Sequence, residues 1–139
     1  MTDLDTWPCA PSLISSWFGS SPDGSPGLPK GLCFRIAVRE IESWIMADRH
    51  AWAAYIEIAA TNFPTRPDEL PDPKQFLINV IRAKGKKKMH ADMLPRGSGH
   101  VGPLYNDVLC RFIQSTWSAN RASRFSPSLM RAINALHRI

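Results

Sequence analysis

The chain has 139 residues, of which 44% are hydrophobic and 21% are charged. This is the composition of one globular domain, and it excludes a disordered tail. No apolar run reaches the roughly 18 residues of a membrane span and no cationic start precedes an apolar stretch, so we expect a soluble cytoplasmic protein with no membrane partner. Cys9, Cys33 and Cys110 form no C-x-x-C or Cys/His cluster, which excludes zinc fingers and disulfide scaffolds.

The net charge of +5 is concentrated in the C-terminal part. Residues 80–139 contain eleven Lys and Arg against two Asp, which leaves +9, whereas residues 1–30 and 31–79 each sum to −2. Such asymmetry is typical of contact with nucleic acid or an acidic membrane surface. The alternative is that the charge serves solubility alone.

The first part of the chain is predicted to combine strands and helices. Residues 1–5 have the pattern of the end of a short strand, and Cys9–Phe18 that of a helix with a proline in its first turn. The Gly-, Pro- and Ser-rich segment Gly19–Lys30 predicts a loop. The apolar, β-branched run Leu32–Val38 fits a strand buried on both faces, and Ile41–Ile58 has the spacing of one or two helices.

The second part is predicted to be helical. The prolines of Thr61–Pro71 predict a loop, after which Asp72 caps a helix that begins at a proline. Pro103 begins a helix that extends to Trp117, and Ser126 caps a last helix. We expect most tryptophans and phenylalanines in the core, because they fall on the apolar faces of these helices.

This order of elements predicts an α/β protein with a parallel sheet and a helical C-terminal half. We expect one domain over residues 1–139, with a sheet core and an acidic rim in 1–60 and a helical, basic part in 61–139. The first strand has only Met1–Asp5 available, where a buried parallel strand needs about five or six residues. The sequence therefore looks as if its natural beginning were missing or supplied by another chain.

Two acidic pairs are candidate metal ligands. Asp3 and Asp5 lie two positions apart, so on a strand both carboxylates point to the same face and can share one hard cation. Glu40 and Glu42 repeat this spacing directly after the buried strand, and functional groups gather at the carboxyl ends of parallel strands. The two pairs would then converge on one rim and hold one or two Mg²⁺ or Mn²⁺ ions for attack at phosphorus.

Alternatives stay open for both pairs. Asp-x-Asp also arises by chance and in turns, and Glu40 and Glu42 would equally suit the first turn of a helix, where the macrodipole favours acids. Asp48 is either a further ligand or the cap of a second helix.

A basic segment and a glycine-rich loop are the candidate sites for nucleic acid. The segment 82–90 surrounds Gly85, which should end the preceding helix, and a phosphate backbone would attract it. The loop Arg96–Pro103 formally matches G-x-G-x-x-G, but without the strand and acidic residue of a dinucleotide site it suggests a small anion-binding loop. The candidate nucleic-acid-binding residues are Arg82, Lys84, Lys86, Lys87, Lys88 and Arg96. The alternative for the segment is a solvated helix end.

Five sequence blocks in chain order carry a resemblance to a known family. They are Thr2–Pro11, Arg35–Asp48, Leu70–Lys74, Val101–Asn106 and Ser126–Arg131. Together they resemble a bacterial Toprim-like family of unknown function, whose members are similar to the Toprim domains of topoisomerases, primases and OLD-type nucleases. Such members are often encoded beside an ATPase in phage-defence operons. The resemblance implies an incomplete Toprim- or Rossmann-like parallel sheet and metal-dependent phosphodiester chemistry.

The resemblance also implies roles for the acidic pairs. Asp3 and Asp5 match the Asp-x-Asp of Toprim domains that coordinates Mg²⁺, and Glu40 and Glu42 match the R-E-x-E block, where we expect catalytic residues. The chain departs from the pattern because the family's first strand, which ends in a catalytic glutamate, is missing. Either the start codon is placed late, or this is a shortened homologue without catalysis, or a partner completes the sheet.

Two functional hypotheses follow. In the first, the chain is part of a Mg²⁺- or Mn²⁺-dependent nuclease in phage defence. In the second, it is a non-catalytic homologue that binds nucleic acid or an ATPase partner. Because a missing strand exposes a sheet edge, we also expect a homodimer.

Overall fold

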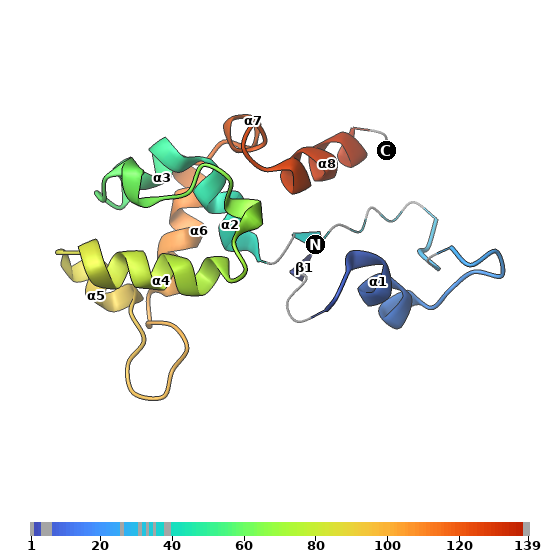
Figure 1. Cartoon of the computed structure of the whole chain (residues 1–139), viewed down its shortest axis with the longest axis horizontal. Coiled ribbons are helices and arrows are strands. Elements are labelled where there is room, and N and C mark those ends of the chain that lie inside the picture. The colour runs from blue at the N-terminus through green and yellow to red at the C-terminus, as the bar shows by residue number, and fades with distance from the viewer. Residues whose placement is uncertain are drawn as a thin grey trace.

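The computed structural model describes residues 2–3, 7–25, 27–30, 32, 34, 36–37 and 40–137. Helices α2 to α8 form a helical body, and α1 with the loop that follows lies to one side of it (Figure 1). Strands β1 (Thr2–Asp3) and β2 (Ile36–Ala37) form a parallel pair that leads into α2. In this pair Asp3 lies opposite Ala37.

The prediction of an α/β fold with an incomplete Toprim- or Rossmann-like parallel sheet was wrong. Most described residues are helical, and β1 and β2, of two residues each, are the only strands among them. The part of the apolar run Leu32–Val38 that is described forms a strand only at Ile36–Ala37. Pairing over two residues buries too little apolar surface for a sheet core, so helices provide the core instead. The homodimer prediction, which rested on the edge of that sheet, stays a prediction.

Helix α1 (Ala10–Phe18) confirms the helix predicted from Cys9 to Phe18. It ends at Gly19, whose φ of 73° favours glycine. Leu13 is its buried residue, and Phe34 packs on its C-terminal end against Trp17 and Phe18.

The region predicted as one or two helices contains α2 (Ile41–Ala47) and α3 (Arg49–Tyr55), separated at Asp48. The predicted proline-rich loop then follows with two short 3₁₀ helices, η1 (Ala60–Asn62) and η2 (Pro67–Glu69). The proline at the start of η2 suits the first turn of a helix.

Helix α4 (Pro73–Lys84) begins as predicted. The Asp72 carboxylate accepts a hydrogen bond from the Gln75 N–H at 2.7 Å, and proline occupies the first helical position. A short helix that the sequence did not predict, α5 (Lys88–Met93), follows in the basic segment.

The remaining helices are α6 (Tyr105–Ser115), α7 (Ala119–Ala122) and α8 (Pro127–Leu136). Helix α6 begins two residues later than predicted, and α7 was not predicted. Helix α8 confirms the predicted cap, because Ser126 accepts a hydrogen bond from the Leu129 N–H at 3.2 Å.

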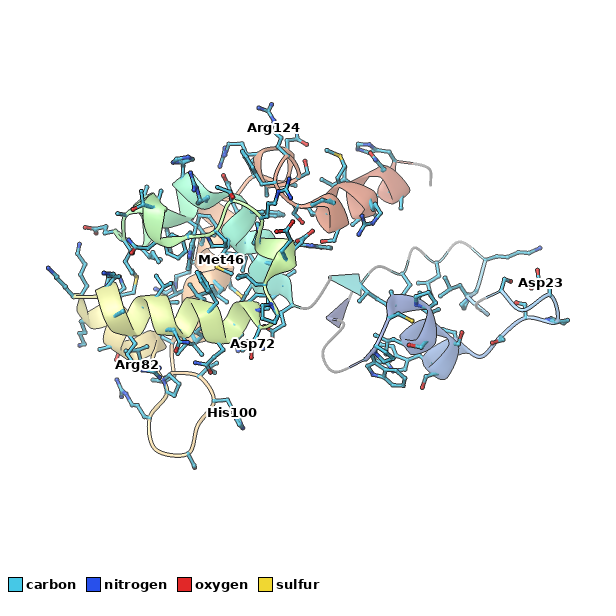
Figure 2. The ribbon with its side chains drawn as sticks, viewed as in Figure 1. Asp23, Met46, Asp72, Arg82, His100 and Arg124 are labelled. Carbon is cyan, nitrogen blue, oxygen red and sulfur yellow. The ribbon has the colours of Figure 1, made fainter. Side chains whose placement is uncertain are left out.

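The main core lies between α2, α3, α4, α5 and α6, and Figure 2 shows Met46 within it. At its centre the Trp52 and Phe112 rings meet edge to face with centroids 4.9 Å apart. A smaller cluster joins α2 to α7 and α8 through Trp44, Ala122 and Leu129. Helix α2 contributes to both clusters, so packing on two sides fixes the position of its first turn. Among the helices of the described residues, none has the length and apolar character needed to cross a membrane.

Candidate active site

The glutamates predicted as catalytic lie at the start of α2. Glu40 is the N-cap residue and Glu42 belongs to the first turn. The sequence offers this location as the alternative to a metal site, because the helix macrodipole favours acidic residues in the first turn. The Glu42 side chain is only 3% exposed, whereas that of Glu40 is 17% exposed. One carboxylate is therefore buried and the other reaches the surface.

The Glu40 carboxylate joins α2 to the first turn of α4. The backbone N–H of Lys74 donates to Glu40 Oε2 at 2.7 Å, and the Lys74 ammonium donates to Glu40 Oε1 at 3.1 Å. Lys74 is the second residue of α4, so this carboxylate also lies at the positive end of that helix. These contacts hold the Glu40 carboxylate in one orientation.

The Glu42 carboxylate is less well satisfied. The Tyr105 hydroxyl donates to Glu42 Oε1 at 3.0 Å, and the Lys74 ammonium lies 3.8 Å from the same oxygen. Glu42 Oε2 is buried and has no hydrogen-bond partner among the described residues. Burial raises the pKa of Glu42, although Lys74 and Tyr105 both act to lower it. Burial, together with the Glu42 charge, also raises the pKa of Tyr105.

These residues form what we call the Glu–Lys–Tyr cluster, which comprises Glu40, Glu42, Lys74 and Tyr105. Its members come from the starts of three helices, α2, α4 and α6. The Lys74 ammonium lies within 4 Å of both carboxylates, and its side chain, which is 38% exposed, extends from them to solvent. Within the cluster one positive charge thus faces two carboxylates, and Glu42 Oε2 has no hydrogen-bond partner among the described residues. Oxygen ligands of this kind suit a hard divalent cation.

The predicted metal ligands of the N-terminal pair are only partly described. Asp5 lies outside the described residues, and for Asp3 the structure gives the backbone, in β1 opposite Ala37. Paired strands lie about 5 Å apart and three residues span at most about 10 Å, so the backbone of Asp3 lies within about 15 Å of that of Glu40. The parallel pairing thus brings the backbone of Asp3 near the start of α2, where Glu40 lies.

Sequence reasoning missed Lys74 and Tyr105 as members of the site. Both occur in blocks that carry the family resemblance, Leu70–Lys74 and Val101–Asn106, but no chemistry was assigned to them there. Their contacts with the glutamates join residues 34 and 63 positions apart, which spacing within one element does not reveal.

Asp48, the further candidate ligand, has a structural role. Its buried carboxylate accepts hydrogen bonds from the Ser118 N–H at 2.9 Å and from Arg121 Nε and Nη2 at 3.0 and 2.8 Å. The hydrogen bonds with Asp48, together with the charge of that carboxylate, raise the pKa of Arg121. Asp48 therefore attaches the α2–α3 junction to α7.

Three lysines of the predicted nucleic-acid-binding set are available to a ligand. Lys84, Lys86 and Lys88 are exposed, and none makes a hydrogen bond or ion pair with another described residue. Lys84 and Lys86 line a hollow of about 410 Å³ beside the end of α3. Lysines presented in this way offer point charges to phosphates and carry no base specificity.

The other predicted cations already have partners. Lys87 forms an ion pair with Glu57, and Arg96 forms one with Asp92 at 2.5 Å. Arg82 donates a hydrogen bond to the amide oxygen of an asparagine one turn earlier in α4. The structure therefore divides the predicted set into free lysines and paired cations.

The histidine of the basic segment has a structural role. His90 is buried, and its Nδ1 accepts a hydrogen bond from the Lys87 N–H at 3.0 Å, so Nε2 carries the proton and donates to the Ile56 carbonyl at 2.7 Å. Gly85 ends α4 as predicted and packs against this ring, because an added Cβ would lie 2.6 Å from His90 Cβ.

No three His, Cys, Asp or Glu side chains of the described residues gather closely enough to bind a metal ion. A cation at the Glu–Lys–Tyr cluster would therefore have two carboxylates from the described part of the chain. Comparisons with protein-family models, curated proteins and solved structures found no match. The Toprim-like resemblance remains a prediction.

Proposed function

We propose that the chain is part of a divalent-cation-dependent nuclease in which Glu40 and Glu42 bind Mg²⁺ or Mn²⁺. The observation that supports this is the unbalanced charge of the Glu–Lys–Tyr cluster. Two carboxylates share the ammonium of Lys74, and the buried Glu42 Oε2 has no hydrogen-bond partner among the described residues. An unpartnered buried carboxylate oxygen costs stability, and coordination to a cation removes that cost.

The residues of the cluster have separate tasks in this proposal. Glu42 and Glu40 contribute oxygen ligands, and Tyr105 orients Glu42 by its hydrogen bond to Oε1. With a cation bound to the two carboxylates, the half-exposed Lys74 ammonium would be available to contact a phosphate oxygen, where it would balance developing negative charge. The bound cation supplies Lewis-acid activation of the phosphodiester and of the attacking water.

Asp3 is the candidate for a further ligand. Its backbone lies within about 15 Å of that of Glu40, through the pairing with Ala37. Lys84, Lys86 and Lys88 supply the contacts with the nucleic-acid backbone, because they are exposed and make no ion pair with a described residue.

A cleavage assay tests the proposal. The purified chain is incubated with supercoiled plasmid and with labelled RNA, in Mg²⁺, in Mn²⁺ and in EDTA. We expect cleavage in either cation and none in EDTA, and we expect Glu42→Gln to lower the rate at least about 100-fold, which corresponds to loss of a transition-state interaction of about 2.7 kcal/mol.

The matched control is Glu57→Gln, a glutamate whose side chain is 58% exposed. This variant should cleave no more slowly than the parent chain, because loss of an anion paired with Lys87 does not weaken contacts with phosphates. The proposal fails if the folded parent chain cleaves neither substrate in either cation, or if Glu42→Gln cleaves as fast as Glu57→Gln.

A second candidate function is nucleic-acid binding without cleavage. The observation that favours it is that both oxygens of Glu40 already accept hydrogen bonds from Lys74, as a purely structural connection between α2 and α4 requires. In that case substituting Lys84, Lys86 and Lys88 by Gln should weaken binding with a smaller salt dependence, and EDTA should change nothing. An ATPase partner and a place in phage defence are predictions that depend on the family resemblance.

A further inference from the structure

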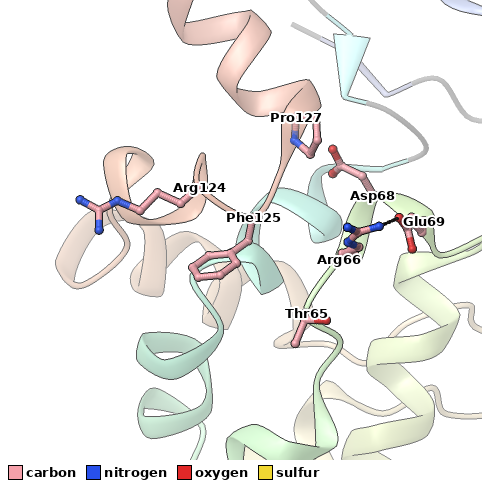
Figure 3. A pocket seen from close by; sticks show the side chains of 7 residues that line it. All are labelled: Thr65, Arg66, Asp68, Glu69, Arg124, Phe125 and Pro127. Atoms are coloured by element: carbon pink, nitrogen blue, oxygen red, sulfur yellow. Dashed lines mark hydrogen bonds and ion pairs between the residues drawn. The ribbon is translucent and has the colours of Figure 1, made fainter.

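A hollow of about 460 Å³ lies between the segment that leads into η2 and the turn between α7 and α8. Phe125 projects into it and is 51% exposed, although large aromatic side chains are usually buried. Figure 3 shows the ring between Arg124 on one side and Thr65 and Arg66 on the other. We call this site the Phe125 hollow.

The two walls of the Phe125 hollow are joined by hydrogen bonds. The Ser126 hydroxyl donates to Asp68 Oδ1 at 2.8 Å, and the Ser128 N–H donates to Asp68 Oδ2 at 2.9 Å. Asp68 belongs to η2, whereas Ser126 caps α8 directly after Phe125. The backbone that carries Phe125 is therefore held against η2 before any ligand binds, which lowers the entropy cost of binding.

Two arginines, Arg66 and Arg124, line the hollow together with the Phe125 ring, as do the acidic residues Asp68 and Glu69. Arg124 is exposed and makes no hydrogen bond or ion pair with another described residue. Arg66 is paired with Glu69 at 3.0 Å, but their side chains are 76% and 67% exposed, so the pair is weak and a phosphate can replace it. A smaller hollow on another side of Phe125 is lined by Arg49 and also by a histidine.

We infer that the Phe125 hollow binds single-stranded nucleic acid, with a base stacked on the Phe125 ring and the neighbouring phosphates against Arg66 and Arg124. An exposed aromatic face beside cations is the combination that single-stranded nucleic acid uses, because every unpaired base presents a π-face and every linkage a negative charge. A duplex keeps its base faces stacked internally and fits this site poorly.

The basic segment differs from the Phe125 hollow in chemistry and in place. The basic segment has no exposed large apolar residue beside Lys84, Lys86 and Lys88. These lysines can contact phosphates, but they offer no ring on which a base could stack. Figure 2 places Arg82, at the start of that segment, and Arg124 on opposite edges of the helical body. The inference rests on the proposed function only in taking nucleic acid as the ligand, and it requires neither a cation nor cleavage.

The test is fluorescence anisotropy with the full chain in EDTA and a fluorescein-labelled 15-nucleotide oligothymidylate as the probe. An abasic 15-mer of the same charge reports phosphate contacts without stacking. Phe125→Leu keeps an apolar side chain, Phe125→Trp keeps an aromatic face, and Arg124→Gln removes a cation. The matched control is Trp17→Leu, since Trp17 is 53% exposed but lies in α1, outside the hollow.

We expect Phe125→Leu to weaken oligothymidylate binding at least about fivefold, as loss of one base stack predicts, and to leave abasic binding unchanged. Phe125→Trp and Trp17→Leu should bind like the parent chain. Arg124→Gln should weaken both probes and lower the slope of log affinity against log salt by about 0.7.

The inference is overturned if the parent chain binds no oligothymidylate, or if Phe125→Leu weakens both probes equally or neither. A protein partner would then be the better occupant of the hollow. Because all measurements are made in EDTA, these results are separate from the cleavage assay, and either proposal can fail alone.

Discussion

Removing the Tyr105 hydroxyl tests the charge state of the Glu–Lys–Tyr cluster. Tyr105→Phe keeps the ring in the core but deletes the 3.0 Å hydrogen bond to Glu42 Oε1, which leaves a buried carboxylate with the Lys74 ammonium 3.8 Å away. A hydrogen bond to a charged group contributes about 1.5–3 kcal/mol, and one to a neutral group about 0.5–1.5 kcal/mol. We therefore expect Tyr105→Phe to lower the free energy of unfolding more where Glu42 is ionised than where Glu42 is protonated.

The sign of the pH dependence follows from the raised pKa of Glu42. Between the ordinary pKa and the raised pKa the folded chain binds more protons than the unfolded chain, so the free energy of unfolding falls as the pH rises. In Tyr105→Phe the pKa of Glu42 is higher than in the parent chain, because the hydrogen bond that lowers it is gone. The free energy of unfolding of the variant therefore continues to fall up to a higher pH than that of the parent chain. The difference between parent and variant therefore grows as the pH rises through the titration of Glu42.

The assay is urea unfolding at pH 5 and pH 8, followed by circular dichroism. Tyr55→Phe is the matched control, because Tyr55 packs on Trp52 and Phe112 and its hydroxyl makes no hydrogen bond with another described residue. Tyr55→Phe should change the free energy of unfolding by less than about 0.5 kcal/mol at both pH values. If Tyr105→Phe loses no more stability at pH 8 than Tyr55→Phe, our description of Glu42 as a buried, poorly satisfied carboxylate is wrong.

Two further predictions concern the scaffold that holds the site. Asp48→Asn should lower the free energy of unfolding by about 2 kcal/mol, because it weakens three hydrogen bonds to a buried carboxylate, one partner of which is half exposed. Thermal unfolding should show this loss, and Asp107→Asn, in an exposed ion pair, should change stability by less than about 0.5 kcal/mol. Gly85→Ala should cost about 1–3 kcal/mol in the same measurement, because the new Cβ would lie 2.6 Å from His90 Cβ. Gly99→Ala, in an exposed loop, should cost clearly less, and equal losses would contradict the packing at Gly85.

Local signals in the sequence predicted the helix starts well. Two helices begin with a capping side chain followed by proline, at Asp72 and at Ser126, and both caps are present. This pattern specifies the cap and the first turn within a few residues. The strand prediction failed because strand formation depends on a partner elsewhere in the chain. The run Leu32–Val38 has the composition of a buried strand, but among the described residues its pairing extends over Ile36–Ala37 alone.

The candidate site was predictable only in part, for a similar reason. Glu40 and Glu42 stand out because their spacing is local, whereas the partners that define their environment, Lys74 and Tyr105, come from other helices. The exposure of Phe125 was also not predictable, because apolar patterning assigns phenylalanines to the core and does not identify the one that packing leaves at the surface.

The most direct test of the proposed nuclease centre is calorimetric titration of Mn²⁺ into the full chain. The parent chain, Glu40→Gln, Glu42→Gln and the exposed control Glu57→Gln are compared at neutral pH. We predict one saturable site in the parent chain and in Glu57→Gln, and at least about tenfold weaker binding in the two cluster variants, as expected when a carboxylate ligand is replaced by an amide. A folded parent chain without saturable binding, or cluster variants that bind Mn²⁺ as the control does, would contradict the assignment of Glu40 and Glu42 as cation ligands.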